Sequence, residues 1–135
     1  MSQENVEVVR REYAALAARD WVAIAEVWHP DIVLESTESE PEAGTYRGVD
    51  EIARYFDTWS KPYSEYRVEA EEIIDAGDRV VAIERVAARG LHGSNADASF
   101  ELSLFRLISF KDGMIWRVKE YPSRAEALAA AGLLE

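Results

Sequence analysis

The fold is decided by one stretch, Phe100–Tyr121, which reads FELSLFRLISFKDGMIWRVKEY. Apolar and polar residues alternate on both sides of residues 111–113, and this pattern predicts two antiparallel β-strands joined by a tight turn. A two-residue loop would place the apolar side of one strand against the charged side of the other. We therefore expect a three-residue loop with Gly113 as a left-handed bulge, which pairs Phe110 with Met114.

In this register the apolar face of the hairpin carries two charged residues, Arg106 and Glu120. Glu120 is expected opposite Leu104, which makes Arg106 its diagonal neighbour and brings the two side chains within reach of each other. A charged pair on a sheet surface that faces the core is the first candidate site. The predicted apolar face comprises Phe100, Leu102, Leu104, Ile108, Phe110, Met114, Trp116 and Val118.

Length and composition restrict the class of protein. A chain of 135 residues, 48% of them hydrophobic, predicts one domain over residues 1–135 with a real core. The net charge of −11 argues against binding to nucleic acid or to an anionic membrane, because both need a basic surface. There is no apolar run of membrane-spanning length, and the start of the chain is acidic and polar. There is also no cysteine, which excludes disulfides. We therefore expect a cytoplasmic protein.

Hydrophobic periodicity predicts three helices in the first half of the chain. The first covers residues 2–18, the second is capped by Asp20 and stops at His29-Pro30, and the third opens at Gly48 and ends at Lys61-Pro62. A short strand, residues 31–36, lies between the second and third helices, followed by a loop over residues 37–47. Alternation in this strand puts Glu35 on the side of Val33 and away from Ile32 and Leu34.

The second half predicts strands and one last helix. Strands at residues 66–75 and 79–88 flank the turn 76–78, residues 89–98 form an exposed loop, and the hairpin follows. Ser123 and Glu126 form a capping box, and Gly132 ends this helix. One of Glu84 and Arg85 points inward, and parity leaves both assignments open. This order predicts an α+β fold, a cone-shaped curved antiparallel sheet wrapped around three N-terminal helices with a pocket at its open end.

Five segments carry a resemblance to a known family. They read VRREYAALAARDW, HPDIVLES, TYRGVDEIARYF, IIDAGDRVVAIERV and FKDGMIWRVKEYPSRAEALAAAGL. With them the chain resembles the SnoaL-like branch of the nuclear-transport-factor-2-like superfamily. The resemblance implies a cone-shaped α+β barrel with a deep pocket, and commonly a homodimer formed through the outer face of the sheet. Members include ketosteroid isomerases, polyketide cyclases and limonene-type epoxide hydrolases, so the fold alone does not select a function.

Each of these enzyme groups implies a different part of a site. The ketosteroid isomerase pattern places its proton-shuttling carboxylate at Glu35, its oxyanion tyrosine at Glu12, one residue before Tyr13, and its protonated acid at Arg106. The isomerase logic, a neutral acid and a tyrosine that donate to an enolate, is therefore not reproduced.

The other two patterns match in part. The epoxide hydrolase pattern matches Arg85 to its arginine and Glu120 to its second aspartate, but has Ala87 where the first aspartate belongs. The polyketide cyclase pattern again implies Glu120, and its histidine has no clear equivalent in His29 or His92.

We expect a small-molecule pocket that serves a cofactor-independent acid–base enzyme of the isomerase or cyclase type, acting on a small apolar carbonyl compound. The alternatives are a non-catalytic binder of a small hydrophobic ligand and a structural dimerisation domain, and the pair Arg106–Glu120 is equally a structural ion pair.

The expected partners are a small hydrophobic molecule and a second copy of the chain. No cofactor or metal motif is present in the sequence. The expected catalytic residues are Glu35, Glu120 and Arg106, and the expected ligand-binding residues are Tyr13, Trp28, Tyr55, Phe56, Trp59, Arg85, Leu104, Trp116 and Val118.

Overall fold

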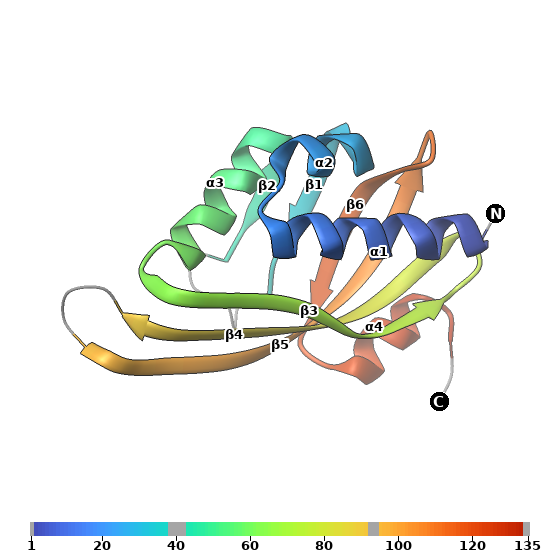
Figure 1. The fold of residues 1–135 in the computed structure, drawn as a ribbon. Coiled ribbons are helices and arrows are strands. Elements are labelled where there is room, and N and C mark those ends of the chain that lie inside the picture. The colour runs from blue at the N-terminus through green and yellow to red at the C-terminus, as the bar shows by residue number, and fades with distance from the viewer. Residues whose placement is uncertain (1, 38–42, 92–94, 134–135) are drawn as a thin grey trace.

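The computed structural model describes residues 2–37, 43–91 and 95–133 (Figure 1). The helices are α1 (Ser2–Ala18), α2 (Trp21–Val27), α3 (Val49–Ser60) and α4 (Arg124–Ala130). The strands are β1 (Trp28–Glu35), β2 (Thr45–Arg47), β3 (Tyr63–Asp75), β4 (Arg79–Leu91), β5 (Asn95–Lys111) and β6 (Met114–Tyr121). They form one curved sheet in the order β2-β1-β6-β5-β4-β3.

The predicted α+β cone is confirmed, with one difference in the sheet. Strand β1 pairs with β6 in parallel, whereas all the other neighbouring strands pair antiparallel, so the sheet is mixed. A parallel pair is possible here because a long connection, and not a hairpin turn, joins β1 to β6. Among the described helices, none is long and apolar enough to cross a membrane.

Helices α1, α2 and α3 lie on one face of the sheet, and α4 lies on the opposite face (Figure 1). The main core fills the space between the three helices and the inner face of the sheet, where Val9, Ile24 and Ile108 are completely buried. A smaller core lies under α4 and joins Ala127 and Leu128 to outer-face residues of β4 and β5. Burial of apolar surface on both faces explains why residues 80–83 and 86–88 of β4 are all apolar.

The second helix ends earlier than the sequence suggested. Asp20 caps α2 as predicted, accepting a hydrogen bond of 3.1 Å from the backbone N–H of Ala23. The helix stops at Val27, and Trp28 already belongs to β1. Since Pro30 disfavours helical geometry before it, the chain leaves the helix two residues ahead of His29-Pro30. Trp28 is therefore a strand residue and is 4% exposed.

The hairpin β5–β6 has a different loop from the predicted one. Asp112 and Gly113 both have positive φ, 55° and 75°, which is the signature of a two-residue type I′ turn. Lys111 pairs with Met114, and the predicted three-residue loop with a bulge at Gly113 is wrong. The bulge lies inside β6 instead, where Trp116 is the extra residue.

This internal bulge places the apolar residues of β5 and β6 on the same face of the hairpin, as the sequence pattern required. Phe110 pairs with Ile115, and Ile108 pairs with Val118. Arg106 therefore stands directly opposite Glu120, not diagonal to it. Ile115 takes the buried position that was expected for Met114 and Trp116, and it is 0% exposed.

Strands β4 and β5 are longer than predicted and take up most of the expected loop over residues 89–98. His92 falls outside the described residues. The choice between Glu84 and Arg85 is settled: the Glu84 side chain is buried on the inner face, whereas the Arg85 side chain is 40% exposed and binds Glu101 on the outer face.

Helix α4 has the predicted start and stop. The Ser123 hydroxyl accepts a hydrogen bond of 3.2 Å from the backbone N–H of Glu126, which completes the N-terminal side of the capping box. At the other end Gly132 has a φ of +79°, and the N–H of Leu133 donates to the carbonyl of Leu128 at 2.8 Å. This hydrogen bond and the positive φ are features of a Schellman motif, which needs the left-handed residue that glycine supplies.

Candidate functional site

A cavity lies between the helices and the inner face of the sheet. It leaves about 80 Å³ for the centres of water molecules, which is room for several waters or one compact ligand. Most of its wall is aliphatic or aromatic, with rings from β1, α3 and β3. The rings that line it belong to Trp28, Tyr55, Phe56, Trp59 and Tyr66.

Four charged residues also line the cavity: Glu12, Glu84, Arg106 and Glu120. They come from α1, β4, β5 and β6, and each is at most 8% exposed. An apolar cavity with a few convergent polar groups is the usual form of a small-molecule site. We call these four residues the charged floor.

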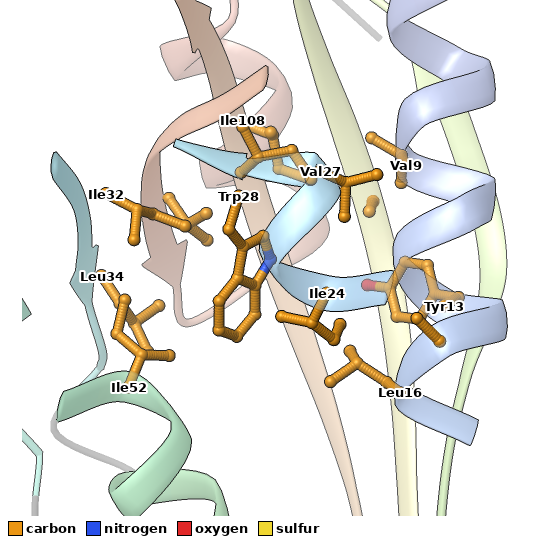
Figure 2. Packing of buried hydrophobic residues seen from close by; sticks show 14 of the residues in the cluster. Val9, Tyr13, Leu16, Ile24, Val27, Trp28, Ile32, Leu34, Ile52 and Ile108 are labelled. Atoms are coloured by element: carbon orange, nitrogen blue, oxygen red, sulfur yellow. The ribbon is translucent and has the colours of Figure 1, made fainter. Parts of the chain in front are cut away.

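Arg106 is held by two hydrogen bonds to Glu12. Its Nη1 donates to Oε1 and its Nη2 donates to Oε2, each at 3.0 Å. This bidentate geometry is the strongest form of contact between a guanidinium and a carboxylate. Glu12 is completely buried and also accepts a hydrogen bond of 2.7 Å from Nε1 of Trp28. Figure 2 shows the Trp28 indole inside the core, with its nitrogen on the side that faces α1.

Tyr13 connects Arg106 to Glu84. Its hydroxyl accepts a hydrogen bond of 2.6 Å from Nη1 of Arg106 and donates one of 2.8 Å to Oε1 of Glu84. The same Glu84 oxygen lies 3.6 Å from Nη1 of Arg106. Helix α1 thus supplies two neighbouring residues that fix both the guanidinium and a second carboxylate.

The surroundings of Arg106 and Tyr13 determine their charge states. Burial alone would lower the pKa of Arg106, but the negative charge of Glu12, with smaller contributions from Tyr13 and Glu84, raises this pKa well above its ordinary value. Burial raises the pKa of Tyr13 well above 10. The positive charge of Arg106 lowers this pKa, and the carboxylates of Glu84 and Glu12 raise it. Arg106 is therefore a permanent cation, and Tyr13 is a neutral phenol at physiological pH.

Most of the expected site residues line the cavity. Arg106 and Glu120 lie on the charged floor. Tyr13 is not part of the cavity wall, but its hydroxyl holds two floor residues in place. The expected wall residues that do line the cavity are Trp28, Tyr55, Phe56, Trp59, Leu104 and Val118.

Besides Tyr13, three expected site residues lie outside the cavity. Glu35 is on the opposite side of β1 from Ile32 and Leu34, which line the cavity, and its half-exposed carboxylate lies 4.0 Å from Nζ of Lys119. Placing Glu35 in the pocket was therefore wrong, because strand alternation turns it outward. Arg85 was placed there wrongly for the same reason. Trp116 is also outside, because it is the bulge residue of β6.

Trp116 instead packs between two cations on the surface. The guanidinium of Arg117 lies 4.4 Å from the centre of its ring, and the ammonium of Lys111 lies 5.3 Å from it. His29 has Nε2 3.5 Å from a carboxylate oxygen of Asp112 in the hairpin turn, and it does not line the cavity.

Sequence reasoning missed Glu12 and underrated Glu84. Glu12 follows Val9 by three residues and precedes Leu16 by four, so it shares the apolar stripe of α1. A lone carboxylate on such a stripe is a usable signal for a buried charge. The isomerase pattern also pointed to positions 12 and 106, and the structure shows that these two residues bind each other.

Comparison with known proteins agrees with this fold. The model of the SnoaL-like domain family matches residues 9–118. Comparison with curated protein sequences finds no match. An NTF2-like protein from Burkholderia thailandensis has 26% identity and a TM-score of 0.75, with 95% of this chain and 96% of that chain covered. A candidate polyketide cyclase from Sinorhizobium meliloti has 28% identity and a TM-score of 0.64, with 85% and 94% covered.

A third solved structure, TerC co-crystallised with polyporic acid, has 21% identity and a TM-score of 0.73, and the alignment covers 96% of this chain and 98% of that chain. At this identity the likeness is one of fold. The family model spans most of the chain, from α1 to β6, and includes every residue of the cavity wall except Glu120. The chain therefore belongs to the SnoaL-like domain family, within the NTF2-like fold.

Proposed function

We propose that this protein is a cofactor-independent acid–base enzyme that moves a proton on a small, largely apolar carbonyl compound. The observation that carries the proposal is the charged floor of an otherwise apolar cavity, with three carboxyl groups and one guanidinium that are nearly inaccessible to solvent. Buried titratable groups that converge on a cavity are typical of sites for proton transfer.

The proton transfer is assigned to Glu120. Glu12 forms two hydrogen bonds of 3.0 Å with Arg106, and the Glu84 carboxylate lies 3.6 Å from the same guanidinium. Glu120 lines the cavity from β6 and stands opposite Arg106.

The reaction follows from these positions. The carboxylate of Glu120 removes a proton from the carbon next to the carbonyl group, and the electron pair of that C–H bond moves to the carbonyl oxygen. The positive charge of Arg106 stabilises the resulting enolate. Where the substrate also has a C=C bond next to the deprotonated carbon, Glu120 returns the proton to the far end of the resulting dienolate, which is an isomerisation. Alternatively, the enolate carbon attacks a second carbonyl of the same molecule, and the alkoxide that forms takes the proton from Glu120, which is a cyclisation.

The likeness to a candidate polyketide cyclase supports the second form of this chemistry, because ring closure of a polyketide begins with an enolate. The aromatic rings of α3 support a flat, apolar substrate, since offset and edge contacts stabilise rings within such walls.

The experiment follows deuterium exchange from D₂O into the carbon next to the carbonyl of acetophenone, cyclohexenone and a small cyclic diketone by NMR. The wild type and Glu35→Gln are expected to accelerate exchange of at least one compound equally. Glu120→Gln is expected to be slower by about 10²–10⁴-fold. Glu35→Gln is the matched control, because Glu35 is a carboxylate outside the cavity. Equal exchange by Glu120→Gln and the wild type would overturn the assignment.

A second candidate function is non-catalytic binding of a small hydrophobic ligand. It is favoured by the closed bidentate contact between Arg106 and Glu12, because a guanidinium already held this firmly is also a structural device. Saturable binding of the same compounds without exchange above the buffer rate would support this second function.

We also propose a homodimer that forms through the outer face of the sheet. The support is the half-buried rings of Phe105 and Tyr121, which lie at the edge of the core under α4 on that face, and the surface pair Arg85–Glu101. Sedimentation at micromolar concentration is expected to give a dimer, and a monomer would contradict it.

A further inference from the structure

The mouth of the cavity can be located from the exposure of its wall. Of the described residues that line the cavity, Phe56, Trp59 and Tyr66 are half-buried, and all the others are at most 8% exposed. Solvent therefore reaches the wall beside these three rings. Two of them belong to α3 and the third to β3, so the mouth lies between these two elements.

Contacts between aromatic rings close this mouth. Phe56 of α3 and Tyr66 of β3 meet edge to face, with their ring centres 5.5 Å apart and their planes at 83°. Phe56 also meets Trp21 of α2 edge to face, again at 5.5 Å. Trp59 extends the closed row, because its ring centre lies 5.8 Å from that of Phe100. A ligand cannot pass between rings in contact, so Phe56 has to move away from Tyr66 to let one enter.

A cation from outside α3 holds Phe56 in the closed position. The guanidinium of Arg19 lies 5.4 Å from the centre of the Phe56 ring, and its Nη1 donates a hydrogen bond of 3.1 Å to Oγ of Ser60. Ser60 lies one turn after Phe56 on α3 and is 1% exposed. One side chain from the end of α1 thus contacts α3 at two positions, and one of these is at the mouth.

The backbone of Arg19 is in a conformation that glycine usually adopts. Its φ is +52°, in the left-handed region. The N–H groups of Arg19 and Asp20 donate to the carbonyls of Leu16 and Ala15 at 3.1 and 2.9 Å, which is the bond pattern of a Schellman motif. Glycine is the common residue at this position because a side chain is strained there. A strained residue points to a role for its side chain, and the contacts of Arg19 with α3 supply that role.

We propose that α3 is the lid of the cavity and that Arg19 is the latch that keeps it closed. While Arg19 contacts Phe56 and Ser60, the Phe56 ring stays against Tyr66 and the mouth is shut. When these contacts break, α3 moves away from β3 and a ligand can enter or leave. A lid of this kind serves a catalyst and a non-catalytic binder equally, so it does not depend on the proposed proton transfer.

The test measures access to the cavity with a reactive thiol. The sequence has no cysteine, so one introduced thiol reports on one place. Val86→Cys puts it in the cavity wall, and the control Val81→Cys puts it in the core under α4, on the other face of the same strand. Methyl methanethiosulfonate is the probe: the thiolate sulfur bonds to its methylthio group, and methanesulfinate leaves.

The rate of this reaction is compared with and without Arg19→Gly, which removes the latch and keeps the left-handed backbone. With Arg19→Gly, Val86→Cys is expected to react about tenfold faster, whereas Val81→Cys should react at an unchanged rate. Unchanged reaction of Val86→Cys would overturn the proposal, because entry would then not depend on the latch. Equal acceleration of both thiols would also overturn it, because the protein would then open as a whole.

Hydrogen exchange of the backbone amides decides the question if a cysteine variant does not fold. Arg19→Gly and Ser60→Ala should each speed exchange in α3, Arg19→Gly by about tenfold, and leave α4 unchanged. Arg54→Gln is the control, since it removes an exposed cation from α3 itself, and it should leave exchange in α3 unchanged. Exchange in α3 that is the same in Arg19→Gly and the wild type would overturn the proposal.

Discussion

Arg106 of β5 and Glu12 of α1 are joined by two hydrogen bonds of 3.0 Å, although 94 residues separate them in sequence. This contact fixes the first helix to the middle of the sheet at the base of the cavity. Both side chains are at most 7% exposed. A buried ion pair contributes little net stability relative to apolar packing, but loss of one partner leaves an uncompensated charge.

Glu12→Gln tests this contact. The substitution keeps the size of the side chain and removes its charge, so Arg106 loses its nearest counter-ion. We expect the free energy of unfolding to fall by about 3 kcal/mol, at the low end of the range for a broken buried pair, because Glu84 remains 3.6 Å away. Urea denaturation measures the change. Glu7→Gln is the control, since its pair with Arg10 is more than 60% exposed, and it should leave the midpoint unchanged. A loss below about 1 kcal/mol in Glu12→Gln would contradict the structural importance of the pair.

The buried phenol of Tyr13 should make the folded protein less stable at alkaline pH. Its folded-state pKa is raised, mainly by burial, whereas the unfolded chain releases the same proton near pH 10. Above about pH 10 the unfolded state therefore binds fewer protons than the folded state, and stability falls by up to about 1.4 kcal/mol per pH unit until the folded pKa is reached. Below pH 10 this contribution is complete.

Tyr13→Phe should lack this alkaline loss. At neutral pH the variant is less stable, because Arg106 and Glu84 each lose a hydrogen bond. Urea denaturation at pH 8, 9, 10 and 11 gives both slopes, and the two proteins should converge in stability above pH 10. Parallel curves across this range would show that Tyr13 ionises as easily in the folded protein as in the unfolded chain.

Replacement of Gly113 should lower the stability of the protein through backbone conformation alone. An added Cβ meets no atom within 4 Å at either Gly113 or Gly44, but only Gly113 has a positive φ, +75°. Gly113→Ala should therefore lower stability by about 1–2 kcal/mol, and Gly44→Ala should be close to neutral. Thermal denaturation of both variants checks this. Equal effects of the two substitutions would mean that the type I′ turn is not required.

The order and kind of the elements could be read from the sequence because each depends on local pattern. Hydrophobic periodicity predicted α1, and Asp20, Ser123 and Gly132 marked helix ends. The parity of the hairpin also predicted that Arg106 and Glu120 share one face, which the structure shows.

The remaining features depend on distant parts of the chain. A bulge at Gly113 and a bulge at Trp116 restore the same parity, so the pattern could not distinguish them; the type I′ turn takes Gly113 and leaves Trp116 as the extra residue. Which of Glu84 and Arg85 points inward depends on which side of β4 faces the helices. Glu12 escaped attention because its partner lies on another element.

The position of a bound ligand tests the central claim most directly. 4-Bromoacetophenone is a small apolar carbonyl compound whose bromine can be located by anomalous diffraction from a co-crystal. The account predicts that the ring lies among Trp28, Tyr55 and Trp59, with the carbon next to the carbonyl group close to the carboxylate of Glu120. Bromine outside the cavity, with the charged floor closed by its own contacts, would contradict it.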